Sequence, residues 1–296
     1  MRFGVALPHF GPAARDPNAP VLIGEVARAA DQLGYYVVWT AEHLIFPRQI
    51  RTPYPYGERA PFDVTDPVYD AAATLAYVAA MTRRVRLGTS VIVLPYHHPI
   101  ALAKQLATID VLSRGRLIVG VASGWLREEF ALLGVPFEQR GAMTDEYIEM
   151  LRRLWADREV NFRGHFFSLD NAISFPKPMQ QPYPPVWIGG GSSAALQRVA
   201  RSGDGWMAPP RDLDHLQVGI RVIRAAAAAA GRDPVSIGIA TSGGARSVDA
   251  LLDLLPDLER IGVTIVNLPA LYWTPSVTKA IELMQTFASR VGLIPG

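Results

Sequence analysis

The stretch PIALAKQLATIDVLSRGRLIVGVASGW, residues 99–125, shows how the chain folds. Proline at its start suits the first turn of a helix, and Ser113-Arg114-Gly115 ends that helix with a glycine suited to the C-cap. The next run, Leu117–Ala122, is apolar and β-branched at its centre, as a strand covered on both faces should be. A turn with glycines at 120 and 124 follows. We therefore expect a helix, a buried strand and a turn at the carboxyl end of that strand.

The same alternation of short apolar strands and longer helices runs in both directions from this stretch. Strands are expected over residues 2–7, 35–40, 85–94, 117–122, 186–188, 205–208, 235–241 and 263–268. Helices are expected over residues 21–33, 66–82, 99–112, 125–133 with 143–155, from 192, and over 213–230, 248–261 and 277–290. A small hairpin is expected within residues 161–169. Eight strands alternating with helices predict an α/β fold, a (β/α)8 TIM barrel forming a single domain over residues 1–296.

The composition excludes several classes of protein. The chain has 296 residues, 49% of them hydrophobic, and a net charge of only +2, which does not suggest a nucleic-acid partner. It has no cysteine, so disulfides and zinc–thiolate sites are excluded. The neighbouring His97 and His98 point apart and no carboxylate lies nearby in sequence, so we expect no metal site. No signal peptide and no apolar run of membrane-spanning length is evident, and we expect a cytoplasmic protein without a membrane partner.

In a barrel of this kind the active site lies at the carboxyl ends of the strands. His43 follows the second strand, where a histidine can exchange a proton near neutral pH, although it also suits a loop cap. Two glycine-bearing turns, residues 120–124 and 189–193, follow the fourth and fifth strands. Glycine lets backbone N–H groups approach an anion, and a helix N-terminus favours negative charge. Together these turns indicate a phosphate-bearing ligand, while each alone also suits a turn or helix cap.

The ordered motifs of the chain resemble those of the bacterial luciferase-like superfamily, and in particular its actinobacterial deazaflavin-dependent branch. The matching stretches are residues 36–43, 87–95, 99–107, 110–125, 134–136, 140–141, 151–155, 176–190 and 203–206. The resemblance implies a TIM barrel that forms a homodimer, with a short insertion and a bulge in the third strand. It also implies a non-prolyl cis peptide bond, here Ser90–Val91, against the ring of a flavin-type cofactor.

The resemblance assigns roles to individual residues. His43 matches a histidine that donates a proton or a hydrogen bond to the substrate, and we expect Glu42 to orient it. Several deazaflavin members have aspartate at position 42, and flavin monooxygenases also show Glu-His there. The expected cofactor contacts are Ser90, Val91 and Val93 from the bulge, Ala122, Ser123 and Gly124 from the first turn, and Gly190, Gly191, Ser192 and Ser193 from the second. His9, Trp39 and Tyr96 are expected to line the substrate pocket.

The resemblance implies an oxidoreductase that transfers hydride between the deazaflavin coenzyme F420 and a small organic substrate of the alcohol, ketone or enone type. One alternative is a monooxygenase that uses reduced FMN, and another is a non-catalytic cofactor-binding protein. Luciferase-type oxygenases need a long mobile lid, whereas the insertion at residues 157–185 is short and stiffened by proline, which favours hydride transfer. The loop over residues 45–64 is expected to cover the site.

Overall fold

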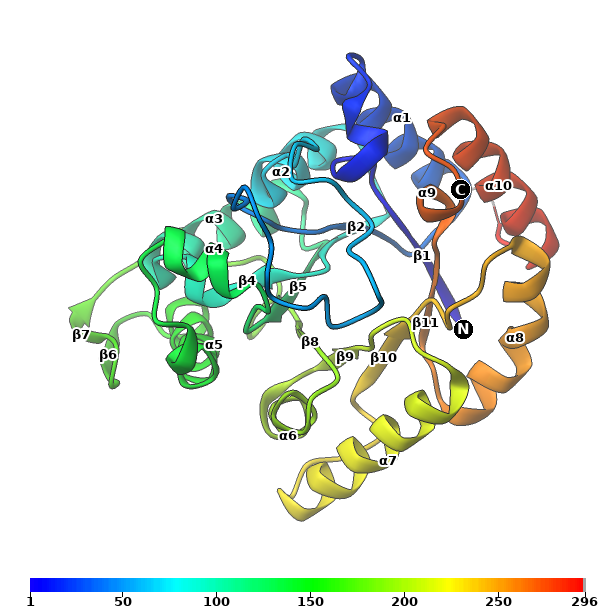
Figure 1. Ribbon diagram of the computed structural model, residues 1–296. Coiled ribbons are helices and arrows are strands. Elements are labelled where there is room, and N and C mark those ends of the chain that lie inside the picture. Colours follow the sequence, from blue (N-terminus) through cyan, green and yellow to red (C-terminus); the bar gives the residue numbers. More distant parts are fainter. Residues whose placement is uncertain (295–296) are drawn as a thin grey trace.

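The computed structural model describes residues 1–294 and consists of a ring of parallel strands surrounded by helices (Figure 1). The barrel strands are β1 Arg2–Ala6, β2 Val37–Thr40, β3 Arg86–Thr89, β4 Ile92–Val93, β5 Leu117–Ala122, β8 Val186–Gly189, β9 Gly205–Met207, β10 Gly238–Thr241 and β11 Ile265–Leu268. They pair in the order β3-β2-β1-β11-β10-β9-β8-β5-β4, and pairing of β3 with β5 closes the ring. Because β3 and β4 occupy one position, the predicted (β/α)8 barrel is confirmed.

Helices follow the strands around the outside of the ring. They are α1 Ala19–Gln32, α2 Ala71–Met81, α3 Pro99–Leu112, α4 Arg127–Leu132, α5 Arg140–Ala156, α6 Ser193–Ser202, α7 Leu213–Ala229, α8 Val248–Ile261, α9 Ala270–Trp273 and α10 Val277–Arg290. The short 3-10 helices are Gly11–Arg15, Leu94–Tyr96 and Phe137–Gln139. The predicted hairpin is present as β6 Val160–Arg163 and β7 Ser168–Ala172, and it projects from the edge of the molecule (Figure 1). Within residues 1–294, no helix is long and apolar enough to cross a membrane.

The start of α2 differs from the prediction. We expected Asp66 to cap this helix, but the Asp70 side chain does so, by accepting a hydrogen bond from the backbone N–H of Ala73 at 2.7 Å. The Asp66 carboxylate instead accepts the N–H of Asp63 and pairs with Arg15. Both aspartates suit a helix N-cap, and tertiary contacts of Asp66 decide between them.

The third strand position contains the predicted bulge. Gly88 lies opposite Ile118 and Ile92 lies opposite Val121, so four steps along β3–β4 match three steps along β5. One extra residue is therefore accommodated between β3 and β4, which is the defining property of a bulge. The Ser90–Val91 peptide bond at this point is cis, as predicted.

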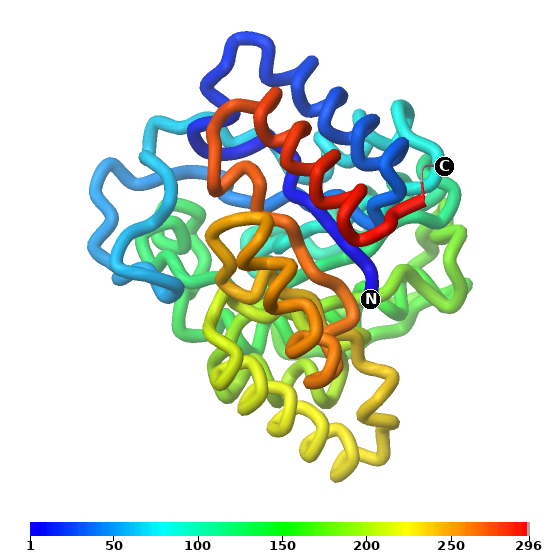
Figure 2. Tube along the Cα trace, turned by 90° about the vertical axis from the view of Figure 1, so that its right-hand side faces the viewer, coloured from blue at the N-terminus to red at the C-terminus, as the bar shows by residue number. Residues whose placement is uncertain are grey.

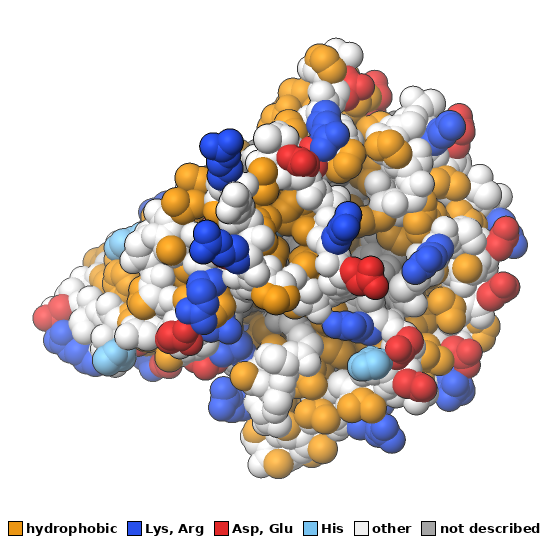
Figure 3. Space-filling view, viewed as in Figure 1, with side chains coloured by type: hydrophobic (Ala, Val, Ile, Leu, Met, Phe, Trp, Pro, Cys, Tyr) orange, Lys and Arg blue, Asp and Glu red, His pale blue; other side chains and the backbone are white. Residues whose placement is uncertain are grey.

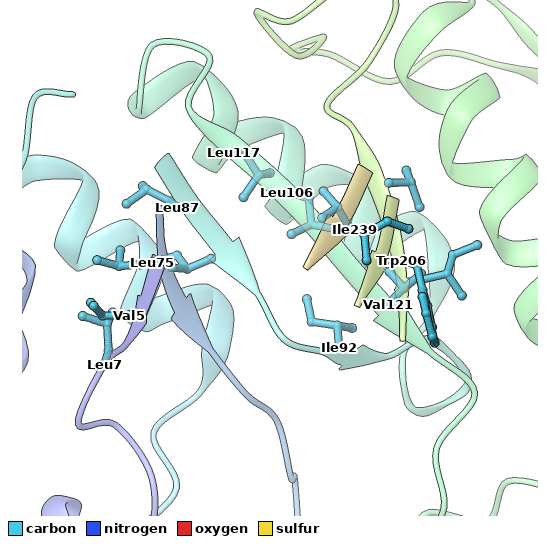
Figure 4. Packing of buried hydrophobic residues seen from close by; sticks show 14 of the residues in the cluster. Val5, Leu7, Leu75, Leu87, Ile92, Leu106, Leu117, Val121, Trp206 and Ile239 are labelled. Atoms are coloured by element: carbon cyan, nitrogen blue, oxygen red, sulfur yellow. The ribbon is translucent and has the colours of Figure 1, made fainter. Parts of the chain in front are cut away.

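Two hydrophobic layers hold the barrel together. The larger layer lies between strands and helices, and Figure 4 shows part of it, with side chains from β1, β3 and β5 beside Leu75 of α2 and Leu106 of α3. The smaller layer fills the ring itself and includes Trp39 and Trp187. Glycine makes room for these indoles, since a Cβ at Gly88 or Gly205 would lie 2.2 Å from the nearest ring.

A long loop, residues 44–66, connects β2 to α2 and is called the lid loop below. It runs across the front of the ring in Figure 1, and after a quarter turn it projects from the left side of the molecule in Figure 2. This is the side on which the strands end and the helices begin. The lid loop therefore covers the face where barrel enzymes hold their substrates.

Candidate active site

A cavity of about 1130 Å³ opens at the carboxyl ends of the strands. This volume is large for a single small molecule, since ligand pockets typically measure about 300–1,000 Å³, and it has room for a cofactor and a substrate together. Of the residues predicted for the site, those that line the cavity are Glu42, His43, Ser90, Val91, Val93, Tyr96, Ala122, Ser123, Gly124, Gly190, Gly191 and Ser192. The sequence thus identified segments that lie far apart in the chain and meet around one space.

His43 lies in this cavity and is held by a carboxylate from α4. Its Nδ1 is 2.7 Å from Oε2 of Glu129, whose side chain is completely buried. The other oxygen of Glu129 accepts the backbone N–H groups of Leu44 and Ile45, at 2.7 and 3.2 Å. Tyr96 donates its hydroxyl to Oε2 at 3.1 Å. A carboxylate oxygen accepts hydrogen bonds, so Nδ1 of His43 is the donor in this pair, and Nε2 has no partner among residues 1–294.

The prediction that Glu42 orients His43 is wrong. Glu42 accepts the backbone N–H of Val93 at 2.8 Å with one oxygen, and its other oxygen is 2.9 Å from Nε2 of His97. Both carboxylate oxygens of Glu42 are thus engaged by Val93 and His97 and not by His43. Glu42 instead fixes the backbone of β4 beside the bulge. The residue that orients His43 is Glu129. It was not predicted, because candidates were taken from the ends of strands and Glu129 lies on a helix. The sequence feature that could have identified it is the acidic pair at 128–129, which follows a glycine turn at the carboxyl end of a strand.

Two residues predicted for the substrate pocket do not line the cavity. His9 is 3% exposed and its ring is held by backbone groups: Nδ1 lies 3.0 Å from the carbonyl oxygen of Leu7, and Nε2 lies 2.7 Å from the backbone nitrogen and 3.0 Å from the carbonyl oxygen of Ala41. Burial lowers the pKa of His9, which keeps the ring neutral and structural. Trp39 points into the ring of strands and donates its indole N–H to Oδ1 of Asn267 at 2.7 Å. Both predictions assumed that residues near a strand end face the ligand.

Tyr96, the third predicted pocket residue, does line the cavity. Burial, and then the nearby charge of Glu129, raise the pKa of its phenol far above the physiological range. The hydroxyl therefore keeps its single proton, which is already donated to Glu129. Towards a ligand, Tyr96 can act only as a hydrogen-bond acceptor or as an apolar surface.

The two glycine-bearing turns differ in what they offer a ligand. In the first, Ser123 lines the cavity, and its hydroxyl oxygen is buried and has no hydrogen-bond partner among the described residues. In the second, Gly190 has φ +111°, which only glycine adopts readily, and Ser192 caps α6 by accepting the N–H of Ala195 at 3.2 Å. Ser193 is exposed and does not line the cavity, contrary to its predicted role as a cofactor contact.

A buried hydroxyl without a partner is costly, which gives a test of its role. Replacing Ser123 with alanine (S123A) should leave the free energy of unfolding unchanged or raise it by about 1 kcal/mol, because an unsatisfied polar group is removed. The same variant should bind a phosphate-bearing cofactor about 10-fold more weakly, because one hydrogen bond to a charged group is lost. Denaturant unfolding and a fluorescence titration measure the two quantities.

The matched control for S123A is S192A. Ser192 is an N-cap, so its loss should lower the free energy of unfolding by about 1 kcal/mol. If S123A instead destabilises the free protein as S192A does, its hydroxyl has an internal partner and is not reserved for a ligand.

Cationic side chains lie on the same face of the molecule, mixed with acidic and hydrophobic ones (Figure 3). Arg140 and Arg198, from α5 and α6, both line the cavity. The guanidinium of Arg198 is almost fully buried and is paired with Asp145 at 2.7 Å. Within residues 1–294, no cluster of His, Asp and Glu could hold a metal ion.

Residues 53–56, 61 and 62 of the lid loop line the cavity, and the loop is anchored on two sides. On one side, α4 holds it through adjacent carboxylates: Glu129 accepts the N–H groups at its start, and Glu128 accepts the backbone N–H and hydroxyl of Thr52, the latter at 2.6 Å. On the other side, Arg211 donates to the carbonyl of Pro55 at 2.8 Å. The expectation that this loop covers the site is therefore confirmed. Glu129 holds both the loop and His43.

Comparison with known proteins identifies the family of the chain. Residues 1–248 match the luciferase-like monooxygenase family. The chain belongs to this family. The resemblance inferred from the sequence motifs is thus confirmed, and the cavity lies at the carboxyl ends of the strands, where TIM-barrel enzymes in general have their active sites.

Relatives within the family use different cofactors. An uncharacterized protein of Mycobacterium tuberculosis is 36% identical over 228 residues, which cover 76% of this chain and 80% of that protein. An F420-dependent glucose-6-phosphate dehydrogenase of Amycolatopsis mediterranei is 32% identical over 66% of this chain and 55% of its own length. An FMNH2-dependent dimethylsulfone monooxygenase of Pseudomonas putida is 31% identical over 64% of this chain and 51% of its own. The crystal structure of the monooxygenase RslO1 from Streptomyces bottropensis superposes with a TM-score of 0.80 at 26% identity and covers 98% of both chains.

Proposed function

We propose that this luciferase-like protein is an oxidoreductase that transfers hydride between the deazaflavin coenzyme F420 and a small organic alcohol or ketone. The observation that carries the proposal is the His43–Glu129 pair, which leaves Nε2 of His43 as a proton acceptor at the cavity. An alcohol that loses hydride from carbon must also lose a proton from oxygen. A histidine with a fixed tautomer is suited to take that proton and to return it in the reverse direction.

The residues around the cavity fit a phosphorylated, flavin-type cofactor. Ser123 has a buried hydroxyl without a partner among residues 1–294, and Gly190 keeps the second turn free of a side chain. Arg140, from α5, lines the cavity and adds positive charge to its wall, whereas Arg198, from α6, is paired with Asp145. Val91, at the bulge, offers an apolar surface for a ring. When bound, a deazaflavin supplies a ring carbon that accepts or returns hydride, and the protein supplies position and the proton acceptor.

The cover of the cavity supports hydride transfer over oxygenation. Luciferase-type oxygenases are expected to need a long mobile lid, and the insertion is the segment that would supply one. Among the described residues, none of 157–185 lines the cavity, since the hairpin β6–β7 projects from the outer edge of the molecule (Figure 1). The cover comes from the lid loop, which is tied to the barrel at Glu128, Glu129 and Arg211.

The second candidate function is that of a monooxygenase using reduced FMN. It is favoured by the similarity to RslO1 over nearly the whole chain and to the FMNH2-dependent enzyme of Pseudomonas putida. The same pocket, the same turns and the same His43 would serve it. The two functions therefore differ in the cofactor that the cavity prefers.

Titration with oxidised and reduced F420 and with FMN, followed by tryptophan fluorescence, tests the proposal. Trp125 and Trp206 line the cavity and should report binding. We expect micromolar binding of F420 and binding of FMN at least 10-fold weaker. Preferential binding of FMN, with oxygen uptake when the reduced cofactor is supplied, contradicts the proposal and supports the second candidate.

A further inference from the structure

Aromatic rings surround the proton-accepting side chain. The ring centroids of Phe46, Phe62 and Phe10 lie 4.7, 5.4 and 5.9 Å from that of His43. Trp125 stands edge-on to the imidazole at 6.1 Å and 89°. Phe10, Phe62 and Trp125 line the cavity, and Phe46 packs behind, stacked on Phe62 at 5.0 Å. These rings are called the aromatic cage below.

The cage brings together segments that are far apart in the chain. Phe10 follows β1, Trp125 follows β5, and Phe46 and Phe62 come from the two ends of the lid loop. Tyr54, from the middle of the same loop, extends the aromatic surface by packing against Trp125 at 5.4 Å. Burial raises the pKa of its phenol, so Tyr54 adds a neutral ring rather than a charge. These rings therefore give the cavity a flat and uncharged wall beside His43, whereas the carboxylate of Glu129, which contacts Nδ1 of His43, is buried and does not line the cavity.

The charged residues that line the cavity are not members of the cage, and several of them already have partners. Glu42 is bound to Val93 and His97, Arg198 is paired with Asp145, and Arg211 is bound to Pro55. The full set of charged or titratable residues that line the cavity, other than His43 and the tyrosines, is Glu42, Glu138, Arg140, Arg198, Arg211, Asp214 and His215. None of them is part of the group of rings around His43.

This arrangement separates anionic from neutral ligand groups. A phosphate or carboxylate packed against these rings would lose part of its hydration, and the rings themselves offer it no cationic partner, which is unfavourable. An uncharged ring would pack against Phe10, Phe62 and Trp125, and each aromatic pair contributes about 0.5–1.5 kcal/mol beyond the burial of area. His43 then supplies the polar contact for the hydroxyl or carbonyl oxygen.

The geometry points to a substrate class: a flat, uncharged ring compound that carries a secondary alcohol or a ketone next to the ring. The inference rests on the proposed function for the reaction, but the cage itself defines what binds. It excludes sugar phosphates from the cage, although one relative is a glucose-6-phosphate dehydrogenase. Phe10 and Phe62 are thus specificity-determining residues.

Binding to the full-length protein, with and without oxidised F420, tests the substrate class without relying on turnover. The probes are acetophenone, its charged analogue 4-acetylbenzoate, and glucose 6-phosphate, with dissociation constants measured by ligand-observed NMR. We expect acetophenone to bind at least 10-fold more tightly than either anion. The variants F62L and F10L should each weaken acetophenone binding about three- to ten-fold while leaving cofactor affinity unchanged.

The control variant is F175L, since Phe175 is 55% exposed on the insertion and does not line the cavity. Two results overturn the inference: tighter binding of an anion than of acetophenone, or acetophenone binding that neither F62L nor F10L weakens.

The assay also separates this inference from the proposed function. Acetophenone binding that depends on Phe10 and Phe62, without reduction of F420 by 1-phenylethanol, supports the cage and contradicts the proposed reaction. Reduction of F420 by glucose 6-phosphate but not by 1-phenylethanol would support the proposed reaction and contradict the substrate class inferred from the cage.

Discussion

Replacing His43 with asparagine (H43N) is expected to lower the rate of hydride transfer about 10²- to 10⁴-fold, the range that a positioned general acid–base contributes. The asparagine amide nitrogen takes the place of Nδ1 and still donates to Glu129, whereas the group at Nε2 is lost. The variant therefore removes the proton acceptor and retains the hydrogen bond that organises the surrounding residues. Cofactor affinity should change less than two-fold, because the cofactor contacts are assigned to Ser123, Gly190 and the bulge.

Stopped-flow absorbance of F420 mixed with 1-phenylethanol measures the rate, and fluorescence titration measures cofactor affinity. The matched control is H165N, because His165 is exposed on the hairpin and does not line the cavity. H165N should retain the wild-type rate. A rate for H43N within a factor of three of the wild-type rate would show that a group other than His43 takes the proton.

The sequence predicted well those features that depend on local pattern. Helices α8 and α10 and strand β5 begin and end where the pattern placed them, since apolar periodicity and capping residues act within a few positions. The two turns were found because glycine is needed where the backbone adopts a positive φ, as at Gly124 and Gly190. The bulge and its cis bond came from the resemblance of the motifs to a family and from no local rule.

The errors concern contacts between distant segments. Glu129 lies 86 positions after His43, and only the closed ring of strands brings the two together. His9 and Trp39 lie near strand ends, as pocket residues do, but one ring is bound by backbone groups and the other points into the barrel. Phe10 and Phe62 were not identified because an aromatic residue in a loop shows nothing of its partners until the loop is folded. The sequence shows which residues lie near the carboxyl ends of the strands, but it does not show which of their side chains meet there.

The last prediction concerns Glu129, the residue that joins the lid loop to His43. Glutamine at this position (E129Q) has one acceptor oxygen and one NH2 group, whereas four donors point at the carboxylate. We expect the NH2 group to face His43 and Tyr96, because the imidazole can change tautomer and the hydroxyl can rotate, whereas the backbone N–H groups of the lid loop can only donate. We expect the free energy of unfolding to fall by about 2–4 kcal/mol, because two buried donors lose their acceptor.

The same substitution should lower hydride transfer about 10²- to 10⁴-fold, since the wrong histidine tautomer places a proton on Nε2. A loss of stability alone would not distinguish a positioning residue from a structural one, so the ¹⁵N chemical shifts of the His43 ring are the decisive measurement. They should report the Nδ1–H tautomer in the wild type and a shift toward the Nε2–H tautomer in E129Q.

The adjacent variant E128Q is the control: Glu128 binds Thr52 but not His43, so the tautomer should stay unchanged even if the lid loop loosens. Tyr96→Phe removes only one of the four donors, so it should lower the free energy of unfolding and the rate of hydride transfer less than E129Q does. An Nδ1–H tautomer that persists in E129Q would mean that Glu129 stabilises the lid loop without setting the protonation of His43.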